Sequence, residues 1–280
     1  MSEVFLSKSD DPEMEAAGRQ ARQTFRFFWR EMTWERQRII PALGMAAVKI
    51  RFEDPPEARE NADGPSVENM WVSDVEYDGR EIRGTLLNQP NWLTSVSEGD
   101  AVVAAPNRIV DWMYTLGERA YGGFTVQLLR SRMSPGERSQ HDNAWGLDFG
   151  DPTNVLVVPP DYLGHEEQSS GGFLGLFKKN SPPPPQSWGE VAATEHPMAV
   201  NCAEMFRTEM AANPETVMAA DEEGVTPLHR FALGGSELIC DILLDSGADP
   251  SVKTAAGRTP AQLAKAIGWK KLSEKLVAKS

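Results

Sequence analysis

A 33-residue period near the C-terminus constrains this chain more than any other feature of its sequence. The residues Gly224–Pro227 recur as Gly257–Pro260, and both copies hold Thr-Pro in the same place. A threonine side chain caps a helix well, and proline suits the first helical position because its missing N–H has no partner there. A fixed period of this length predicts a stack of repeated helical units.

The first copy, residues 221–254, predicts two short helices. Leu228, Phe231 and Ala232 share one apolar face, and Gly234-Gly235 ends that helix and reverses the chain. A second amphipathic pattern follows, and Gly247 stands where a helix end favours a left-handed residue. The apolar positions of the second pattern are Leu238, Ile239, Ile242 and Leu243.

The TPLH of residues 226–229 and the 33-residue period resemble the ankyrin repeat. The resemblance implies an all-α stack that presents a curved surface to a protein partner and carries out no chemistry. About three units are needed to bury the apolar faces, so we expect a degenerate first repeat around Val200–Ala220 and a capping repeat after Thr254. Lysines at the solvent face of the last copy fit that cap: Lys265, Lys270, Lys271, Lys275 and Lys279.

The resemblance also places residues on the surface that would meet a partner. Arg230, Leu233 and Arg258 are expected on the concave face, with Glu222 and Glu223 at a turn tip. His229 belongs to the TPLH turn. We interpret its imidazole as a structural hydrogen-bonding group rather than a catalytic one.

Composition limits the classes of function. The chain has 280 residues, 40% of them hydrophobic, and a formal net charge of −13. No basic face suits a phosphate backbone, so nucleic acid is not expected as a partner. Residues 189–250 hold 12 acidic and 2 basic side chains. This run has two interpretations, a solvated surface or an acidic docking face.

The two cysteines, Cys202 and Cys240, fall on predicted helices and form no disulfide framework or metal motif. The N-terminus lacks an apolar signal core, and no run is long enough to cross a membrane. We therefore expect a cytoplasmic protein without stable membrane insertion. The sequence points to no cofactor and no metal, and it leaves the oligomeric state open.

The N-terminal part predicts an α+β domain with an antiparallel sheet. Residues 12–38 read as a long amphipathic helix with Ala17, Ala21, Phe25, Phe28 and Met32 on one face. Strands are expected at 46–52, 68–77, 80–87 and 100–105, and Asp78-Gly79 predicts a hairpin turn. Residues 108–115 read as a short helix or turn, and 121–133 as a strand that runs into a helix.

The order VENMWV, DGREIRGTLLNQP, EGDAVVA, RIVDWMY and GGFTVQLL resembles the YegJ-like family, a bacterial domain of unknown function, over residues 16–138. The resemblance implies a small α+β fold and a bacterial source, and it implies no activity. By analogy, fusion of such a domain to a short ankyrin tail is typical of bacterial proteins of unassigned role, some of them near toxin–immunity systems.

No catalytic motif appears, and we assign no catalytic residue. The polar groups near aromatic residues are Asn88 and Asn91 by Trp92, Asp111 by Trp112, and His141 with Asp142. Asn91, Trp92, Asp111 and Trp112 form a candidate recognition surface, with burial in the core as the alternative for the tryptophans. The four histidines, His141, His165, His196 and His229, are scattered and read as surface or structural residues.

Three segments follow: a YegJ-like domain at 1–163, a Gly/Ser/Pro-rich linker at 164–190 and the ankyrin repeats at 191–280. The PPPP of the linker reads as a stiff spacer. Its FLGLF segment, residues 173–177, has three interpretations: it docks on a domain, it binds a partner or membrane surface, or it has no role.

The sequence thus predicts a non-catalytic protein-binding protein, an adaptor or an immunity-type inhibitor of a bacterial partner. The alternative is a small-ligand-binding or cryptic hydrolase N-terminal domain that the ankyrin module targets, which a polar pocket around Asp111 would favour.

Overall fold

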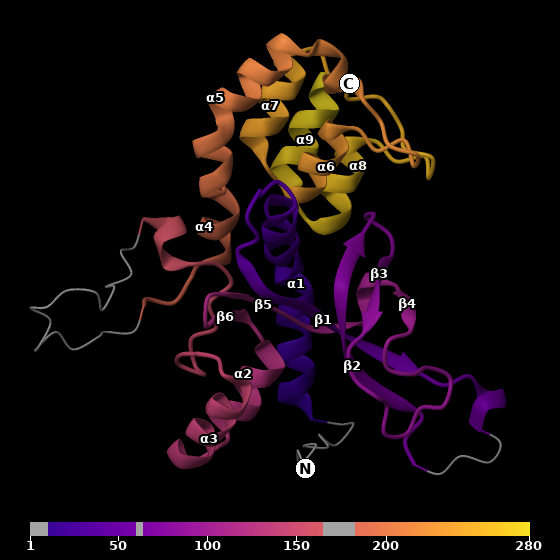
Figure 1. Ribbon diagram of the computed structural model, residues 1–280, viewed down its shortest axis with the longest axis vertical. Helices are drawn as coiled ribbons and strands as arrows, with labels where there is room; N and C mark the ends of the chain where they lie inside the picture. Colours follow the sequence, from indigo (N-terminus) through magenta and orange to yellow (C-terminus); the bar gives the residue numbers. More distant parts are fainter. Residues whose placement is uncertain (1–10, 60–63, 165–182) are drawn as a thin grey trace, which may run out of the picture. The chain divides into compact units, whose positions relative to one another are not determined.

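The computed structural model describes residues 11–59, 64–164 and 183–280 (Figure 1). The chain forms two compact units. The first contains the part of the chain up to Thr24 together with Leu43–Val155, and the second contains Phe25–Ala42 together with Leu156–Ser280. The FLGLF segment and His165 lie outside the described residues. The predicted domain limits of 1–163, 164–190 and 191–280 stay a prediction.

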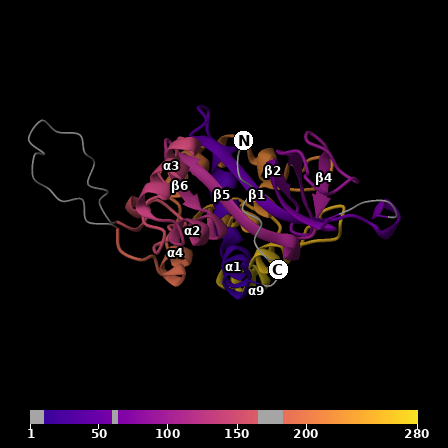
Figure 2. The same cartoon turned by 90° about the horizontal axis from the view of Figure 1, so that it is seen from below.

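The first unit is built on a six-stranded sheet in which every neighbouring pair is antiparallel, in the order β4-β3-β2-β1-β5-β6 (Figures 1 and 2). The strands are β1 (Leu43–Glu53), β2 (Val67–Tyr77), β3 (Ile82–Leu86), β4 (Ala101–Ala104), β5 (Ile109–Leu116) and β6 (Arg119–Gly122). The predicted antiparallel sheet with helices is therefore confirmed. Gly79 takes a φ of 86° in the β2–β3 turn, as the Asp-Gly pair predicted.

One predicted element is wrong. Residues 108–115 were expected as a short helix or turn, and they form β5 next to β1. The segment shows no alternation of polar and apolar side chains, because both of its faces are covered. Trp112 lies on one face, where its Nε1–H donates to Ala21 O at 2.9 Å. Met113 lies on the other, in a cluster with Val126 and Phe149.

Helices flank the sheet. Helix α1 (Pro12–Glu35) begins after Asp11, whose Oδ1 accepts the backbone N–H groups of Glu13 and Met14. Its first half covers the sheet face that holds Trp112. Helix α2 (Phe124–Ser131) follows β6 as predicted, and α3 (Pro135–Trp145) begins at a Ser134-Glu137 capping box that the sequence interpretation overlooked. Short 3-10 turns are η1 (Pro56–Arg59) and η2 (Pro106–Arg108).

The second unit is helical. After η3 (Pro160–Leu163) come α4 (Trp188–Ala193), α5 (Pro197–Ala212), η4 (Pro214–Met218), α6 (Pro227–Gly234), α7 (Glu237–Asp245), α8 (Pro260–Ile267) and α9 (Lys270–Lys279). Proline opens α5, α6 and α8, where its fixed φ suits the first turn. The helical C-terminal region was predicted, and the apolar side chains expected to face its core are buried at Leu228, Phe231 and Ala232.

The second half of α1 completes the core of the second unit. Between Phe27 and Trp34 every side chain is buried except half-buried Met32. Trp34 contacts the rings of Phe206 on α5 and Phe231 on α6, with centroids 6.3 and 5.4 Å away. A helix buried around its whole circumference belongs to the interior of its unit. The prediction of one apolar face is confirmed for the first half of α1. In the second half, nearly every side chain is buried, so the buried surface is wider than that one face.

Candidate functional site

The turns that precede α6 and α8 are tied to each other. The Ala255 backbone N–H donates to Glu223 O at 2.8 Å, which joins the tip of one turn to the next. His229 provides a second link: its Nδ1 accepts the Thr226 backbone N–H at 3.2 Å, and its Nε2 lies 3.1 Å from Arg258 O. With Nδ1 as an acceptor, the proton sits on Nε2 and donates to that carbonyl.

This arrangement confirms the structural interpretation of His229. The side chain is fully buried, and burial lowers the pKa of His229 because the charged imidazolium loses its hydration. Both ring nitrogens are engaged within the repeated turns, so the ring is not available to attack or coordinate a substrate.

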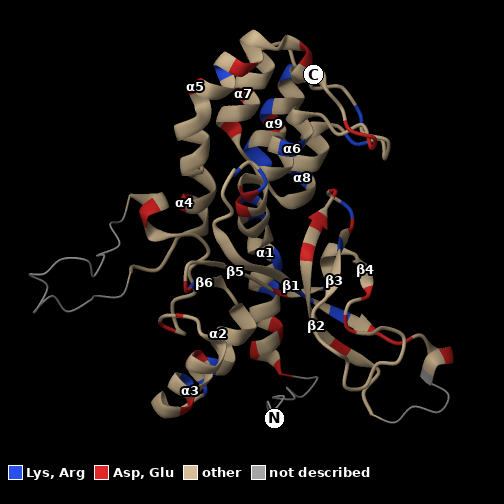
Figure 3. Ribbon diagram, viewed as in Figure 1, with Lys and Arg blue, Asp and Glu red and all other residues tan. Residues whose placement is uncertain are grey.

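Four of the five predicted partner-binding residues reach solvent around these turns. Glu222, Glu223 and Arg230 are exposed, and Arg258 is half-buried. Leu233 is buried, so its side chain contributes to the core of the unit instead of the surface. The charged segments of the two turns are visible in Figure 3.

Arg230 is held in place by the turn that it accompanies. Its Nη2 lies 2.6 Å from Asp221 Oδ2, while Asp221 Oδ1 accepts the backbone N–H groups of Glu223 and Val225. One carboxylate therefore orients both the turn tip and the arginine. The result is a rigid presentation of one cation beside two exposed carboxylates, those of Glu222 and Glu223.

The last helix pair, α8 and α9, presents lysine side chains to solvent. Lys265, Lys270, Lys271 and Lys279 are exposed. Lys275 is half-buried because it turns toward α7, where its Nζ contacts Glu237 at 2.8 Å and Asp241 at 2.6 Å. Part of the acidic run between residues 189 and 250 is thus neutralised within the unit.

The four candidate residues of the first unit do not form one exposed surface. Asn91 is exposed and Trp92 is 37% exposed, and both lie on a loop whose backbone N–H groups donate to the Glu68 carboxylate. Asp111 and Trp112 are fully buried. A recognition role for the loop at Asn91 and Trp92 stays a prediction.

The carboxylate of Asp111, on β5, accepts the free backbone N–H groups at the N-terminus of α2. Its carboxylate accepts the backbone N–H groups of Phe124 at 2.9 Å and Thr125 at 2.7 Å, and the Thr125 hydroxyl at 2.6 Å. Gly123 supplies the left-handed turn that lets the strand enter the helix. These bonds account for the carboxylate and support its interpretation as a brace rather than an open catalytic group.

Lys49 of β1 is the charged neighbour of this cap. It pairs with Asp111 in the β1–β5 register, its Nζ lies 3.3 Å from Thr125 Oγ1, and its ammonium stands 4.8 Å from the centre of the Trp71 ring. Burial lowers the pKa of Lys49 and raises the pKa of Asp111, and the opposite charge of each partner limits both shifts.

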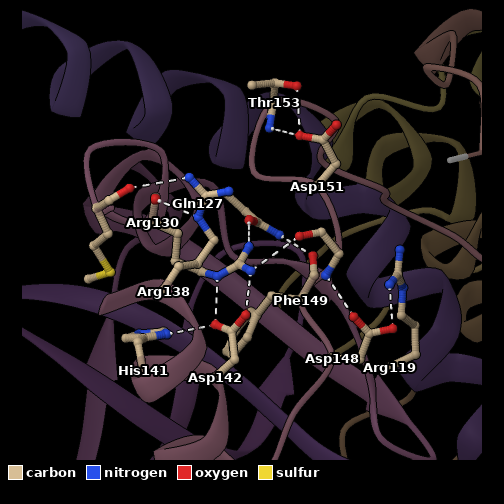
Figure 4. Close-up of polar contacts among 12 residues, drawn as sticks. Arg119, Gln127, Arg130, Arg138, His141, Asp142, Asp148, Phe149, Asp151 and Thr153 are labelled. Atoms are coloured by element: carbon tan, nitrogen blue, oxygen red, sulfur yellow. Dashed lines mark hydrogen bonds and ion pairs between the residues drawn. The ribbon is translucent and has the colours of Figure 1, made fainter. Parts of the chain in front are cut away.

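A second buried network joins α2, α3 and the following loop (Figure 4). Arg130 donates from Nε and Nη2 to the two carboxylate oxygens of Asp142, at 2.8 and 2.5 Å, and from Nη1 to Gln127 Oε1. Gln127 in turn donates to Phe149 O. A bidentate arginine–carboxylate pair fixes geometry, so this network holds α3 against α2.

His141 lies at the edge of that network. Its Nδ1 is 3.0 Å from Asp142 Oδ1, and its ring packs by Trp145 and Phe149. The Asp142 pKa is lowered although burial opposes this, because Arg130 and His141 donate to the carboxylate. The predicted pairing of His141 with Asp142 thus has a structural partner, Arg130, that the sequence interpretation did not identify.

The sequence reasoning missed three polar pairs, namely Arg130 with Asp142, Lys49 with Thr125, and Glu31 with His196. Each pair joins residues from different elements, so no local motif marks it. One signal was present for the Glu31–His196 pair: three charged residues, Arg26, Arg30 and Glu31, lie among the aromatic residues of 25–34. Charged residues inside such a segment are buried only when they are paired.

No group of three or more His, Cys, Asp or Glu side chains of the described residues is placed to hold a metal ion. In the same part of the chain, no helix has the length and apolar character needed to span a membrane. Cys202 and Cys240 are both free, and each lies on a helix as predicted.

Comparison with known proteins shows a family match for the N-terminal region and shorter matches to two named proteins. Residues 11–149 match the family described as "Uncharacterized protein conserved in bacteria (DUF2314)". Uncharacterized protein YegJ of Escherichia coli is 37% identical over 62 residues, which cover 22% of this chain and 40% of YegJ. The human ARF GTPase-activating protein GIT1 is 43% identical over 56 residues, or 20% of this chain and 7% of GIT1.

One relative matches almost the whole chain. The protein named "Putative ankyrin repeat protein NMB1133/NMB1171" from Neisseria meningitidis serogroup B is 37% identical over 272 residues, which cover 97% of this chain and 95% of the relative. The chain therefore belongs to the family of this Neisseria protein and carries a DUF2314 domain in its N-terminal region.

Proposed function

We propose that this chain is a non-catalytic protein-binding protein that recognises its partner with an ankyrin-type stack. The stack would consist of α5 with η4 as a degenerate first repeat, then α6–α7, then α8–α9 as the cap. Its role would be that of a cytoplasmic adaptor, or of an immunity-type inhibitor that masks a bacterial partner. The name of the Neisseria relative and the 33-residue period both favour the repeat assignment.

One observation carries the proposal: the exposed charged groups at the turns are held by a rigid frame. The Ala255–Glu223 and His229–Arg258 hydrogen bonds join successive turns, and Asp221 orients Arg230. Side chains on a preformed scaffold lose little conformational entropy on binding, which favours affinity. Glu222, Glu223, Arg230 and Arg258 are the proposed contact residues.

The buried carboxylate of the first unit supports the non-catalytic part of the proposal. Asp111 would have been the centre of a polar site in the alternative function, a ligand-binding or hydrolytic domain. Its oxygens instead accept hydrogen bonds from Trp112, Phe124 and Thr125. The alternative therefore gains no support from this residue.

The test is affinity capture with the whole chain, because α1 contributes to the core of the second unit. A partner retained from native bacterial lysate is identified by mass spectrometry and its affinity then measured with purified proteins. Replacing Glu223→Lys together with Arg230→Glu is expected to weaken binding by roughly tenfold or more. The melting temperature should fall only slightly, because both side chains are exposed and an exposed ion pair such as Arg230–Asp221 contributes at most about 1 kcal/mol.

The matched control is Lys271→Glu together with Glu274→Lys, which changes two exposed charges on α9 and keeps the net charge. This variant is expected to bind as the unmodified chain does. Equal loss in both variants would indicate a general electrostatic effect. Unchanged binding after replacement of Glu223 and Arg230 would remove these residues from the proposed contact surface.

A further inference from the structure

A cavity of about 530 Å³ lies at one end of three neighbouring strands in the first unit, and Glu53, Ser66 and Arg108 are among the residues that line it. Strand β1 ends at Glu53, β2 begins directly after Ser66, and β5 begins directly after Arg108. Because β1 is antiparallel to both β2 and β5, these three residues come together at the same end of the sheet. The volume lies in the range of small-molecule sites, about 300–1,000 Å³.

One wall of the cavity is formed by Asp54, Pro55 and Pro56, and its shape is fixed. Asp54 is 4% exposed, and its carboxylate accepts the backbone N–H and hydroxyl groups of Thr94 and Ser95 at distances of 2.6–3.2 Å. The two proline rings restrict the backbone and present apolar surface. The Asp54 carboxylate is therefore used to hold the wall in place, and the wall offers a ligand an apolar surface.

Two groups of opposite charge line the same cavity without neutralising each other. Glu53 and Arg108 are both exposed, and no ion pair among the described residues includes either of them. Arg108 Nη1 lies 3.5 Å from Arg51 O, at the long limit of a hydrogen bond, so most of the guanidinium donors remain for other groups. Half-buried Ser66 adds a hydroxyl. The cavity thus combines a cation, a carboxylate and a hydroxyl with an apolar wall.

This combination of charges limits the class of ligand. A simple anion would be attracted by Arg108 and repelled by Glu53, and a simple cation would meet the reverse. A molecule that carries both charges is attracted by both residues. A guanidinium binds a carboxylate through two parallel hydrogen bonds, and a carboxylate and a hydroxyl both accept hydrogen bonds from an ammonium group.

We propose that this cavity binds a free, zwitterionic α-amino acid with an apolar side chain. Its carboxylate lies on Arg108, its ammonium group lies on Glu53 and Ser66, and its side chain packs against Pro55 and Pro56. In a free amino acid one carbon atom separates the two charged groups, so both fit within a cavity of this volume. The inference is independent of the partner-binding role of the turns before α6 and α8.

Isothermal titration calorimetry of the full chain tests the inference. The probes are L-leucine and L-phenylalanine, together with two analogues of phenylalanine that each lack one charge: 3-phenylpropionate has no ammonium group, and phenethylamine has no carboxylate. At least one of the two amino acids is expected to bind with a dissociation constant of about 1 mM or lower. Each analogue should bind at least roughly tenfold more weakly than phenylalanine, because one charged residue of the cavity then has no partner.

Variants of the two charged residues assign the binding to this cavity. Arg108→Gln and Glu53→Gln should each raise the dissociation constant by roughly tenfold or more. The matched controls are Arg80→Gln and Glu98→Gln, two exposed residues that do not line the cavity. Arg80 follows the opposite end of β2 from Ser66. Both control variants should bind as the unmodified chain does, and all four should keep its melting temperature within a few degrees, because each change is at an exposed position.

Absence of binding by both amino acids at concentrations up to about 10 mM would overturn the inference. Binding of 3-phenylpropionate as tight as that of phenylalanine would also overturn it, because the site would then recognise an anion alone. Equal losses in the cavity variants and the controls would place the binding elsewhere. None of these results would alter capture of a protein by the second unit, so the two proposals fail separately.

Discussion

The Nε2 atom of His196 lies 3.1 Å from Oε2 of Glu31, and both side chains are 1% exposed. His196 Nδ1 accepts the Met198 backbone N–H, so the ring proton sits on Nε2 and donates to Glu31. Glu31 also accepts from Arg38 at 2.8 Å, and the imidazole stacks on Trp34. A histidine at the start of α5 is thus joined to α1 through a buried hydrogen bond.

This relationship predicts a loss of stability at mildly acidic pH. Burial lowers the pKa of His196 in the folded protein, although Glu31 opposes the shift. The unfolded chain takes up a proton as pH falls through about 6.5, and the folded chain does so only at its lower pKa. The unfolded state therefore binds more protons in that window. As the pH decreases, the free energy of unfolding decreases by at most about 1.4 kcal/mol per pH unit.

Urea unfolding at a series of pH values between about 5 and 7 measures this dependence. His229 adds a dependence of the same sign, because its pKa is also lowered by burial. The His196→Gln variant should be less stable than the unmodified chain at neutral pH. The slope of its free energy of unfolding against pH should be smaller by the contribution of one titrating proton. A slope equal to that of the unmodified chain would contradict the assignment.

Removal of the Trp34 side chain should destabilise the second unit. Trp34 is fully buried and contacts rings on α5 and α6, so Trp34→Ala is expected to cost about 3–5 kcal/mol. Hydrogen exchange should then show loss of protection in both helices. The control is Gln23→Ala, an exposed position on the same helix that should change stability by less than about 0.5 kcal/mol.

A fragment of residues 156–280 tests the same packing in another way. It lacks Phe27, Arg30 and Trp34, which contact Trp269, Val191 and Phe231. We expect low helix content by circular dichroism and recovery when a peptide of residues 25–42 is added. A fragment that folds fully without the peptide would show that α1 is not needed for this core.

Asp111→Ala should destabilise the first unit strongly. The change removes the acceptor of the buried N–H groups of Phe124 and Thr125. It also removes the carboxylate that lies beside Lys49. The expected cost is about 3–5 kcal/mol, measured by urea unfolding. Glu98→Ala, at an exposed position, is the control with an expected change below about 0.5 kcal/mol. Equal effects of the two changes would contradict the capping role.

Gly235 and Gly247 form a matched pair for a test of packing. Both have positive φ, at 74° and 96°, so alanine at either site costs roughly 1–2 kcal/mol. A Cβ at Gly235 would also lie 2.1 Å from the Trp269 ring, whereas a Cβ at Gly247 meets nothing within 4 Å. Thermal unfolding should therefore show the larger loss for Gly235→Ala, and similar losses would contradict the close approach of Trp269.

Local patterns predicted most of the elements. The 33-residue period and the Thr-Pro pairs placed the starts of α6 and α8, because capping and proline geometry act within a few residues. The strands β1 to β4 followed from short apolar runs and the Asp78-Gly79 turn. Strand β5 was missed because burial on both of its faces removes the alternation that marks a strand.

For a related reason, the exposure of some candidate site residues was predicted and that of others was not. Glu222, Glu223 and Arg230 lie in and beside a turn whose shape is local, and they are exposed as expected. The burial of Leu233, Asp111 and Trp112 depends on what packs against them from other elements. Trp112, for example, is covered by α1, which lies 88 residues away in sequence at Thr24.

The sequence by itself determined the repeat period, the helix starts, the sheet class and the acidic character of residues 189–250. Tertiary structure decided how the 24 residues of α1 are used: those up to Thr24 belong to one compact unit, and those from Phe25 on belong to the other. An amphipathic pattern reports that a helix has an apolar side, but it carries no information on which distant residues bury it. Glu31 and His196 illustrate the reason, since a buried pair separated by 165 positions is specified by packing alone.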